Sequence, residues 1–181
     1  MKIVLDPGHS GLCEPGACGG GLTEAGLVLY IARFTLAELE LRGHSVRLTR
    51  DGPVDDAEIP WRTELANEWG ADLFICIHCN ASGRVDAEGT ETYCYPGSVR
   101  GRELARRIQF CLTDALLTED RGVKEANFEV LRETNCPAVL VECGFISNPV
   151  DREMLADPLE QWRIGAAIAT AVEEYENGGN S

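Results

Sequence analysis

The chain has 181 residues, of which 44% are hydrophobic and 25% are charged, which suits one globular domain with its own core. Thirty acidic against sixteen basic residues give a net charge of -14, which disfavours nucleic acid or an anionic membrane surface as a partner. The first residues lack a secretory signal and no apolar run could cross a bilayer, so we do not expect the chain to be exported by itself.

Strand-like and helix-like patterns alternate through the first half of the chain. Apolar runs rich in β-branched residues predict strands, and segments of good helix formers that end at glycine predict helices. The predicted order is strand 2–6, helix 24–43, strand 44–50, helix 59–70 and strand 72–78.

The same alternation continues in the second half. We predict a half-exposed strand over 89–97, a helix over 99–117, short strands at 128–132 and 138–142, and helices over 149–156 and 158–176. Strands alternating with helices indicate a single α/β domain over residues 1–176, with a largely parallel sheet covered by helices on both faces. Residues 177–181 are predicted to be a disordered tail or linker stub.

Eight cysteines are many for a chain of this size, but their spacing is not that of a disulfide scaffold. Free thiols in a reducing compartment are the simpler interpretation, and a pairing of Cys13 with Cys18 is left open. Cys76 and Cys79 have the spacing of half a zinc site, but residues three apart on a strand point to opposite faces. A metal shared by these two cysteines is therefore disfavoured.

Two of the three histidines, His9 and His78, follow predicted strands, whereas His44 precedes one. Ligands bind an open α/β sheet beyond the carboxyl ends of its strands, so His9, His78 and Glu142 are expected at one edge, with His44 at the other. Two histidines and a carboxylate are a common ligand set for catalytic zinc. Glu24, at the start of the first long helix, is the best third ligand; alternatively it only complements the helix dipole.

Glu142 ends an apolar run, where an ionised carboxylate is costly unless it has a partner or a task. It is a candidate general base beside a metal-activated water, which would make the reaction metal-assisted amide hydrolysis. The alternative is a structural carboxylate that accepts hydrogen bonds from the turn after it. Cys79 or Cys143 as a nucleophile is a further alternative, which strand parity weakens.

Several segments in register match a known family: "IVLDPGHSG", "GLTE", "LTRDG", "ADLFICIHCNAS", "GTETYCYPGS" and "RGVKEANFEVLRETNCPAVLVECGFISNP". The chain resembles the zinc-dependent N-acetylmuramoyl-L-alanine amidases (type 3 amidase family), over essentially its whole length. The resemblance implies one zinc ion per chain on His9, Glu24 and His78, with Glu142 as general acid and base. It also implies a phosphorylase/hydrolase-like fold with a twisted sheet of about six strands.

The activity implied by the resemblance is hydrolysis of the amide between N-acetylmuramic acid and L-alanine in peptidoglycan. Asn80 and Asn127 are candidates for binding substrate, with turn formation as the alternative. The chain departs from the usual family pattern at Ser10, Glu14 and Cys79. We expect a monomer made in the cytoplasm that acts on the cell wall after release or lysis. Three settings remain open: a phage endolysin, a bacterial autolysin and a domain of a longer exported protein. Two other functions also remain open, namely a catalytically inactive wall-binding module and a redox or metal-storage protein.

Overall fold

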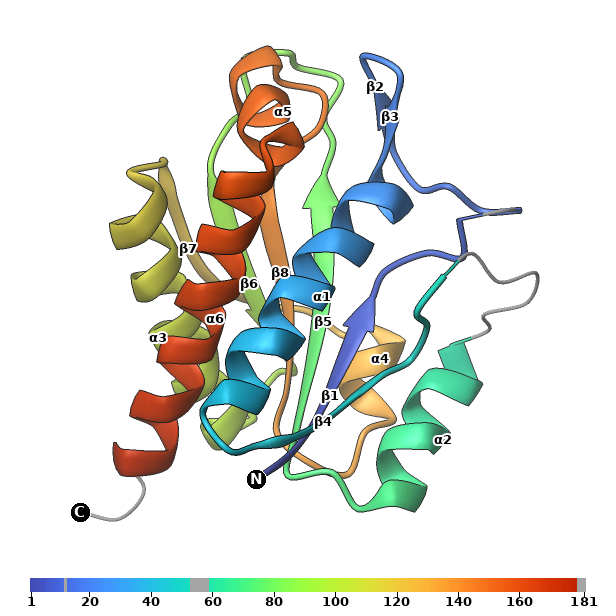
Figure 1. The fold of residues 1–181 in the computed structure, drawn as a ribbon, viewed down its shortest axis with the longest axis vertical. Helices are drawn as coiled ribbons and strands as arrows, with labels where there is room; N and C mark the ends of the chain where they lie inside the picture. Colours follow the sequence, from blue (N-terminus) through green and yellow to red (C-terminus); the bar gives the residue numbers. More distant parts are fainter. Residues whose placement is uncertain (12, 53–58, 179–181) are drawn as a thin grey trace.

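A computed structural model describes residues 1–11, 13–52 and 59–178 of the chain (Figure 1). Six strands form one sheet in the order β4-β1-β5-β8-β6-β7, and a short hairpin stands beside it. The strands are β1 (Lys2–Pro7), β2 (Cys18–Gly19), β3 (Leu22–Thr23), β4 (Ser45–Leu48), β5 (Leu73–Asn80), β6 (Thr90–Cys94), β7 (Asp120–Glu125) and β8 (Ala138–Phe145). Among the described pairings of the six-stranded sheet, only that of β6 with β8 is antiparallel, so the predicted mostly parallel sheet is confirmed.

Helices cover both faces of this sheet. One face packs against α1 (Glu24–Leu41), α3 (Val99–Leu116), α5 (Pro149–Ala156) and α6 (Pro158–Gly178). The other face is covered by α2 (Ile59–Trp69) and α4 (Glu129–Arg132). Alternation along β1 explains both cores, because Ile3 and Leu5 point to the larger core and Val4 points to the smaller one.

The structure corrects two of the predicted elements and adds a strand that was not predicted. Residues 128–132 were predicted as a strand but contain the short helix α4, which buries Val130 and Leu131. The strand in this region is β7, whose polar sequence "DRGVKE" carries no alternating pattern. The strand predicted over 89–97 is mostly buried rather than half-exposed, because β6 lies between β8 and β7.

Three of the predicted boundaries also differ. β8 extends to Phe145, so Glu142 lies within the strand rather than at its end, and His78 likewise lies within β5. α6 continues to Gly178, two residues into the predicted tail, and residues 179–181 lie outside the described part.

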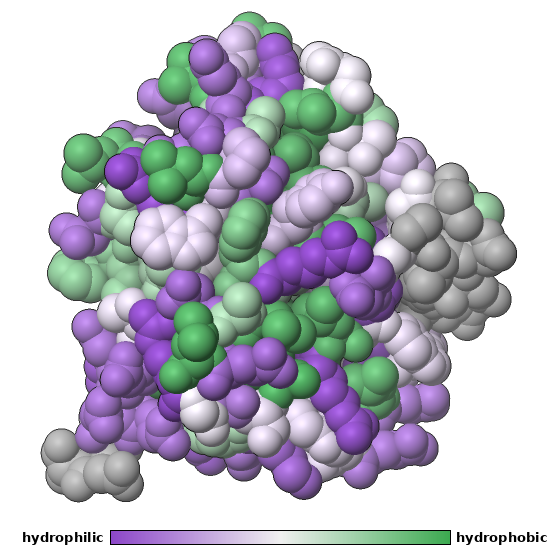
Figure 2. Space-filling model, in the orientation of Figure 1, coloured by the Kyte–Doolittle hydropathy of each residue, from purple (hydrophilic) through white to green (hydrophobic). Residues whose placement is uncertain are grey.

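In the described ranges, none of the helices combines the length and the apolar character that crossing a membrane requires. On the face that carries α1 and α6, hydrophilic and hydrophobic side chains are interspersed (Figure 2).

Candidate metal centre and active-site cleft

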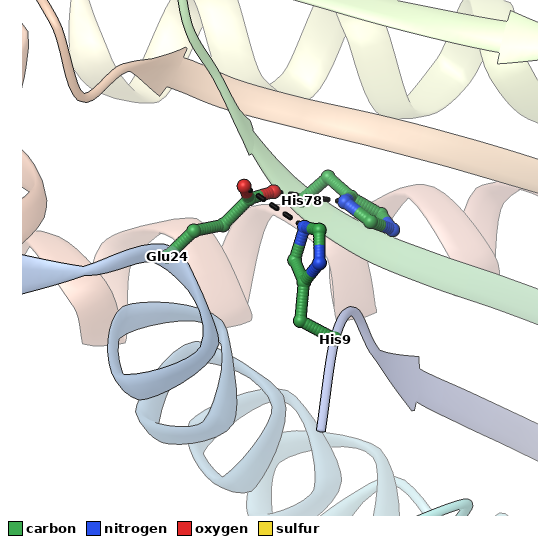
Figure 3. A group of neighbouring side chains, drawn as sticks. All are labelled: His9, Glu24 and His78. Atoms are coloured by element: carbon green, nitrogen blue, oxygen red, sulfur yellow. Dashed lines mark hydrogen bonds and ion pairs between the residues drawn. The ribbon is translucent and has the colours of Figure 1, made fainter. Parts of the chain in front are cut away.

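Three side chains from three separate elements meet at one edge of the sheet. Ligand atoms of His9, Glu24 and His78 all lie within 4.8 Å of one another. The Glu24 carboxylate lies between the two rings, with Oε2 2.9 Å from His9 Nε2 and Oε1 2.8 Å from His78 Nδ1 (Figure 3). The structure therefore brings these three residues together, as predicted.

The local structure explains how each group reaches this point. His9 lies in the loop after β1 with a φ of 64°, in the left-handed region that is unfavourable for residues other than glycine. Glu24 is the first residue of α1, which Thr23 caps by accepting a hydrogen bond from the Gly26 N–H at 3.2 Å. His78 comes from β5, next to β1 in the sheet.

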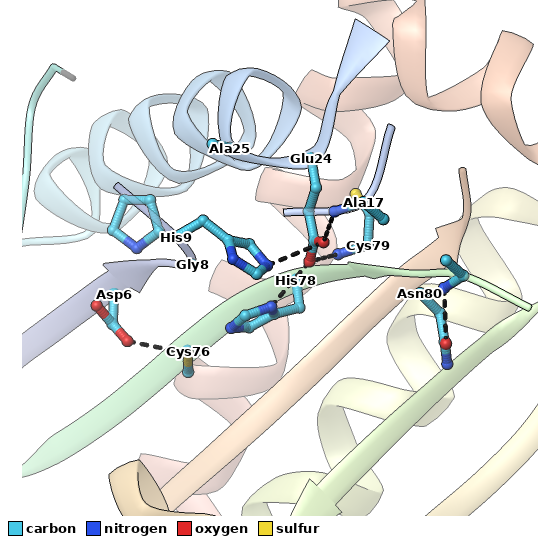
Figure 4. Close-up of polar contacts among 12 residues, drawn as sticks. Asp6, Gly8, His9, Ala17, Glu24, Ala25, Cys76, His78, Cys79 and Asn80 are labelled. Atoms are coloured by element: carbon cyan, nitrogen blue, oxygen red, sulfur yellow. Dashed lines mark hydrogen bonds and ion pairs between the residues drawn. The ribbon is translucent and has the colours of Figure 1, made fainter. Parts of the chain in front are cut away.

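The Glu24 carboxylate is held in its ionised form. Its Oε2 accepts from the Ala17 N–H at 3.0 Å, and its Oε1 accepts from the Cys79 N–H at 3.0 Å (Figure 4). Burial acts to raise the pKa of Glu24, but the hydrogen bonds from His78 and His9 outweigh it and hold this pKa well below its usual value. A buried anion between two imidazoles is a strong attractor for a cation.

The surroundings of these groups fit a bound divalent metal ion. His9 Nδ1 lies 2.5 Å from Glu14 Oε1, an arrangement that orients an imidazole and points its Nε2 toward Glu24, where a metal would bind. A Cβ added to Gly8 would lie 2.4 Å from the His78 ring, and one added to Gly16 would lie 2.5 Å from the His9 ring. Two glycines thus keep room for the rings, and a His₂Glu set leaves a coordination position open for water and substrate.

Glu142 lies beside this centre on the neighbouring strand. β5 and β8 pair in parallel with His78 opposite Glu142, so both side chains point to the same face. Both line a cleft of about 360 Å³ whose walls also include His9, Phe128 and Leu140. A larger groove of about 500 Å³, beside Tyr30 and Phe34, is lined by none of the candidate ligands and lacks Glu142.

The Glu142 carboxylate has no structural partner at one of its oxygens. Within the described ranges, no hydrogen-bond partner reaches its Oε2. The turn that follows is tied instead by Asp151, whose Oδ2 accepts from the Phe145 N–H at 2.8 Å. Burial raises the pKa of Glu142 to about 7, with Glu24 and Glu91 adding to the effect and His78 opposing it. The alternative role of Glu142 as a turn cap is thus filled by another residue.

This pKa predicts a pH-dependent stability difference in the chelator-treated protein. The pKa of Glu142 is raised from 4.5 to about 7, so the folded protein holds this proton more tightly than the unfolded chain does. The stability that the proton contributes to wild type is complete below pH 4.5 and is lost as the pH rises through 7. Glutamine cannot ionise, so Glu142→Gln should gain about 2 kcal/mol relative to wild type between pH 5 and pH 8. Urea unfolding of both proteins at the two pH values checks this, and an equal difference at both would contradict it.

A buried ionic network supports the loop that carries His9. Asp6 Oδ1 accepts from Arg62 Nη1 at 2.6 Å and from Thr49 Oγ1 at 2.5 Å. Cys76 Sγ lies 3.0 Å from Asp6 Oδ2 (Figure 4). Arg62 also donates to the carbonyl oxygens of Pro7 and His9, and Arg50 donates to those of Pro7 and Gly8. These bonds hold the unfavourable backbone conformation at His9.

The network was missed in the sequence, although two signals were available. Asp6 is a carboxylate within a buried strand, and Arg50 lies two residues after the end of β4. Which cation meets Asp6 depends on the placement of α2, which a sequence pattern does not reveal.

Removing Arg62 should destabilise the protein strongly. Arg62→Met leaves the buried Asp6 carboxylate without its cation, and breaking a buried pair in this way costs about 3 kcal/mol. Chemical denaturation should show a smaller loss for the double variant Asp6→Asn/Arg62→Met than for Arg62→Met alone. A double variant that is less stable than the single one would contradict the assignment.

The remaining candidates have the following positions. Asn80 Nδ2 donates to Glu91 at 2.9 Å, and Asn127 Oδ1 accepts from Arg132 at 2.9 Å, so their binding of substrate stays a prediction.

His44 lies near the Met1 amino group, at the opposite edge from His9 as predicted. Cys13 and Cys18 are exposed free thiols. Burial raises the pKa of both Cys79 and Cys143, whose side chains belong to the larger core, which argues against a cysteine nucleophile.

Comparison with known sequences gives a consistent match. The family model described as N-acetylmuramoyl-L-alanine amidase matches residues 3–174. The chain is 39% identical, over 98% of its length, to "N-acetylmuramoyl-L-alanine amidase CwlM" of Bacillus licheniformis, and it spans 67% of that protein. It is 40% identical, over 86% of its length, to the "Sporulation-specific N-acetylmuramoyl-L-alanine amidase" of Bacillus subtilis (strain 168), of which it spans 60%.

Comparison with solved structures agrees with the sequence match. The structure titled "N-acetylmuramoyl-L-alanine amidase AmiC2 of Nostoc punctiforme" superposes with a TM-score of 0.92 at 34% sequence identity. The match covers 98% of this chain and 97% of that one, so the two share the whole domain.

Proposed function

Because the chain belongs to the N-acetylmuramoyl-L-alanine amidase family, we propose that it hydrolyses the amide between N-acetylmuramic acid and the L-alanine of the peptidoglycan stem peptide. The chain spans 67% and 60% of the two curated relatives above, so the proposal concerns the activity of this domain.

Members of this family depend on a metal ion, and we propose that this chain binds one zinc ion through His9, Glu24 and His78. The donor set supports zinc because two imidazoles and one carboxylate are typical of catalytic zinc in hydrolases. When bound, the cation supplies Lewis acidity toward the scissile carbonyl and the attacking water.

The chain's own residues carry the proton transfers. Glu142, with its pKa near 7 in a buried setting, accepts the proton of the attacking water and returns it to the nitrogen of the departing alanine. Glu14 and Arg62 hold His9 from its Nδ1 and its backbone oxygen, which fixes the direction of its Nε2.

The observation that carries the proposal is the unpartnered Glu142 oxygen in the same cleft as the three ligand groups. A buried carboxylate oxygen without a hydrogen bond is costly, and proteins keep such a group where it has a chemical task.

Digestion of purified cell walls tests this function. The purified protein is analysed for metal content, then assayed before and after chelation and after zinc is restored. We expect about one zinc per chain, with zinc-dependent release of free N-terminal L-alanine from intact glycan strands, identified by mass spectrometry. Cleavage at a sugar linkage or at another peptide bond, or wall binding without cleavage, would overturn the proposal.

A further inference from the structure

A second charged group lies directly beside Glu142, on strand β6. β6 and β8 pair antiparallel with Glu91 opposite Glu142, so the two carboxylates share a face of the sheet. Glu91 is only 3% exposed, whereas the cations that contact it lie at the surface. The amidase chemistry described above assigns no task to this group.

Glu91 is saturated with hydrogen-bond donors. Its Oε1 accepts from the Tyr93 hydroxyl at 2.6 Å and from Asn80 Nδ2 at 2.9 Å. Its Oε2 accepts from Arg121 Nε at 2.8 Å and from Lys124 Nζ. These donors and their charges hold the pKa of Glu91 below its usual value despite burial. Glu91 therefore remains an anion that fixes the positions of Arg121 and Lys124.

The two cations keep binding capacity after this pairing. Two cations share one carboxylate, so the group is locally positive in a chain whose net charge is -14. Their side chains are 35% and 38% exposed. Within the described contacts, Arg121 uses its Nε and Nη1 and Lys124 uses one of three N–H bonds, which leaves donors for an external anion.

Two aromatic rings connect Lys124 to the cleft. Lys124 Nζ is 5.8 Å from the centre of the Tyr93 ring, and that ring packs at 5.3 Å against Phe128, which lines the cleft. β7 lies two strands from β8, which corresponds to about 10 Å from Glu142 at the usual spacing of neighbouring strands.

This separation suits a group that binds the residue one position beyond the scissile bond. An extended chain advances about 3.4 Å per residue, so a carboxylate on the residue after the L-alanine comes about 7 Å from the scissile nitrogen. A cation that binds this carboxylate lies about 3 Å further, at about 10 Å. In peptidoglycan, that second residue is glutamate linked through its side chain, and its α-carboxyl group is either free or amidated. A positive subsite at this distance distinguishes the two forms.

We propose that Arg121 and Lys124, held by Glu91, bind the free α-carboxylate of the second stem residue and make this chain prefer stems in which that group is not amidated. The inference rests on the proposed amidase function and adds a specificity to it. Charge-assisted hydrogen bonds to a carboxylate are stronger than neutral ones, so we expect a preference of roughly tenfold or more.

Two soluble muropeptides that differ only in this carboxyl group, free or amidated, test the proposal. The wild-type enzyme should cleave the free acid with a kcat/KM about tenfold higher, mostly through KM, and the preference should fall as salt is added. Lys124→Gln and Arg121→Gln should each raise KM for the free acid several-fold more than KM for the amidated substrate, so that the preference falls. Lys124→Arg, which keeps the charge, should retain the preference.

Arg102→Gln is the matched control. Arg102 belongs to helix α3, on the opposite face of the sheet, where it is 44% exposed and pairs with Glu125. This change therefore removes one cation without touching the subsite. It should leave the preference at its wild-type value.

The outcomes separate the two proposals. If the wild type cleaves the amidated stem as well as the free one, the subsite is disproved while the amidase function stands, and no variant has to fold for that result. If the variants slow both substrates equally, the cations act on structure rather than on specificity, and the proposal is overturned. If neither substrate is cleaved at the alanine amide, the proposed function itself fails.

Discussion

Glu142→Gln is expected to lower the rate of amide hydrolysis by about a thousandfold while the protein still binds one metal ion, because proton transfer by a positioned group contributes 10²–10⁴-fold. Glutamine has nearly the same shape as glutamate, but it cannot accept the proton of the attacking water. Glu142 is not among the three residues that converge as candidate metal ligands, so metal content should not change. Steady-state rates on a soluble muropeptide, with metal analysis of the same sample, check the result.

Glu129→Gln is the control for this variant. Glu129 is exposed and lines the same cleft from α4, so the change has the same chemistry in the same space. It should keep activity within about twofold, as surface substitutions usually do. A Glu142→Gln enzyme that retains a tenth of the wild-type rate or more would show that another group moves the proton.

Glu24→Gln should abolish stable metal binding, with an affinity loss of about a hundredfold or more, since even the groups behind a ligand contribute 10–100-fold. The buried anion between His9 and His78 becomes neutral, while the side chain keeps its size and can still hydrogen-bond the rings. Titration of the chelator-treated protein with zinc, followed by calorimetry, measures the loss, and activity at limiting zinc should disappear with it.

Glu14→Gln is a graded comparison for this prediction. Glu14 contacts His9 Nδ1 from outside the ligand group and is 63% exposed, so its removal should weaken zinc binding about tenfold. If Glu24→Gln binds zinc as tightly as wild type, Glu24 is a helix-terminal carboxylate and the metal ligands must be sought elsewhere.

The elements that the sequence predicted correctly have strong local signals. β1 and β5 are runs of apolar, partly β-branched residues, and α1 begins at a capped glutamate and ends before Gly43. The errors fell where the local signal was weak: β7 is polar and lies at the sheet edge, and the four-residue α4 is too short to show helical periodicity.

The convergence of His9, Glu24 and His78 was within reach of sequence reasoning for a physical reason. In a sheet built of strand and helix units, the ends of β1 and β5 and the start of α1 must meet at one edge, so position along the chain predicts position in space. Their assignment as metal ligands came equally from the matched motifs, and it stays a prediction that the zinc titration tests.

The sequence by itself determined the α/β class, the family and the convergence of His9, Glu24 and His78, because these depend on local patterns and on motifs in chain order. The contacts of Asp6 with Arg62 and of Glu91 with Arg121 and Lys124 were decided only by the tertiary structure. Each joins residues 30 to 56 positions apart, and their pairing depends on strand order and helix placement. Local propensity carries no information about which distant charge will lie opposite a buried carboxylate, since that partner is set by the packing of the whole domain.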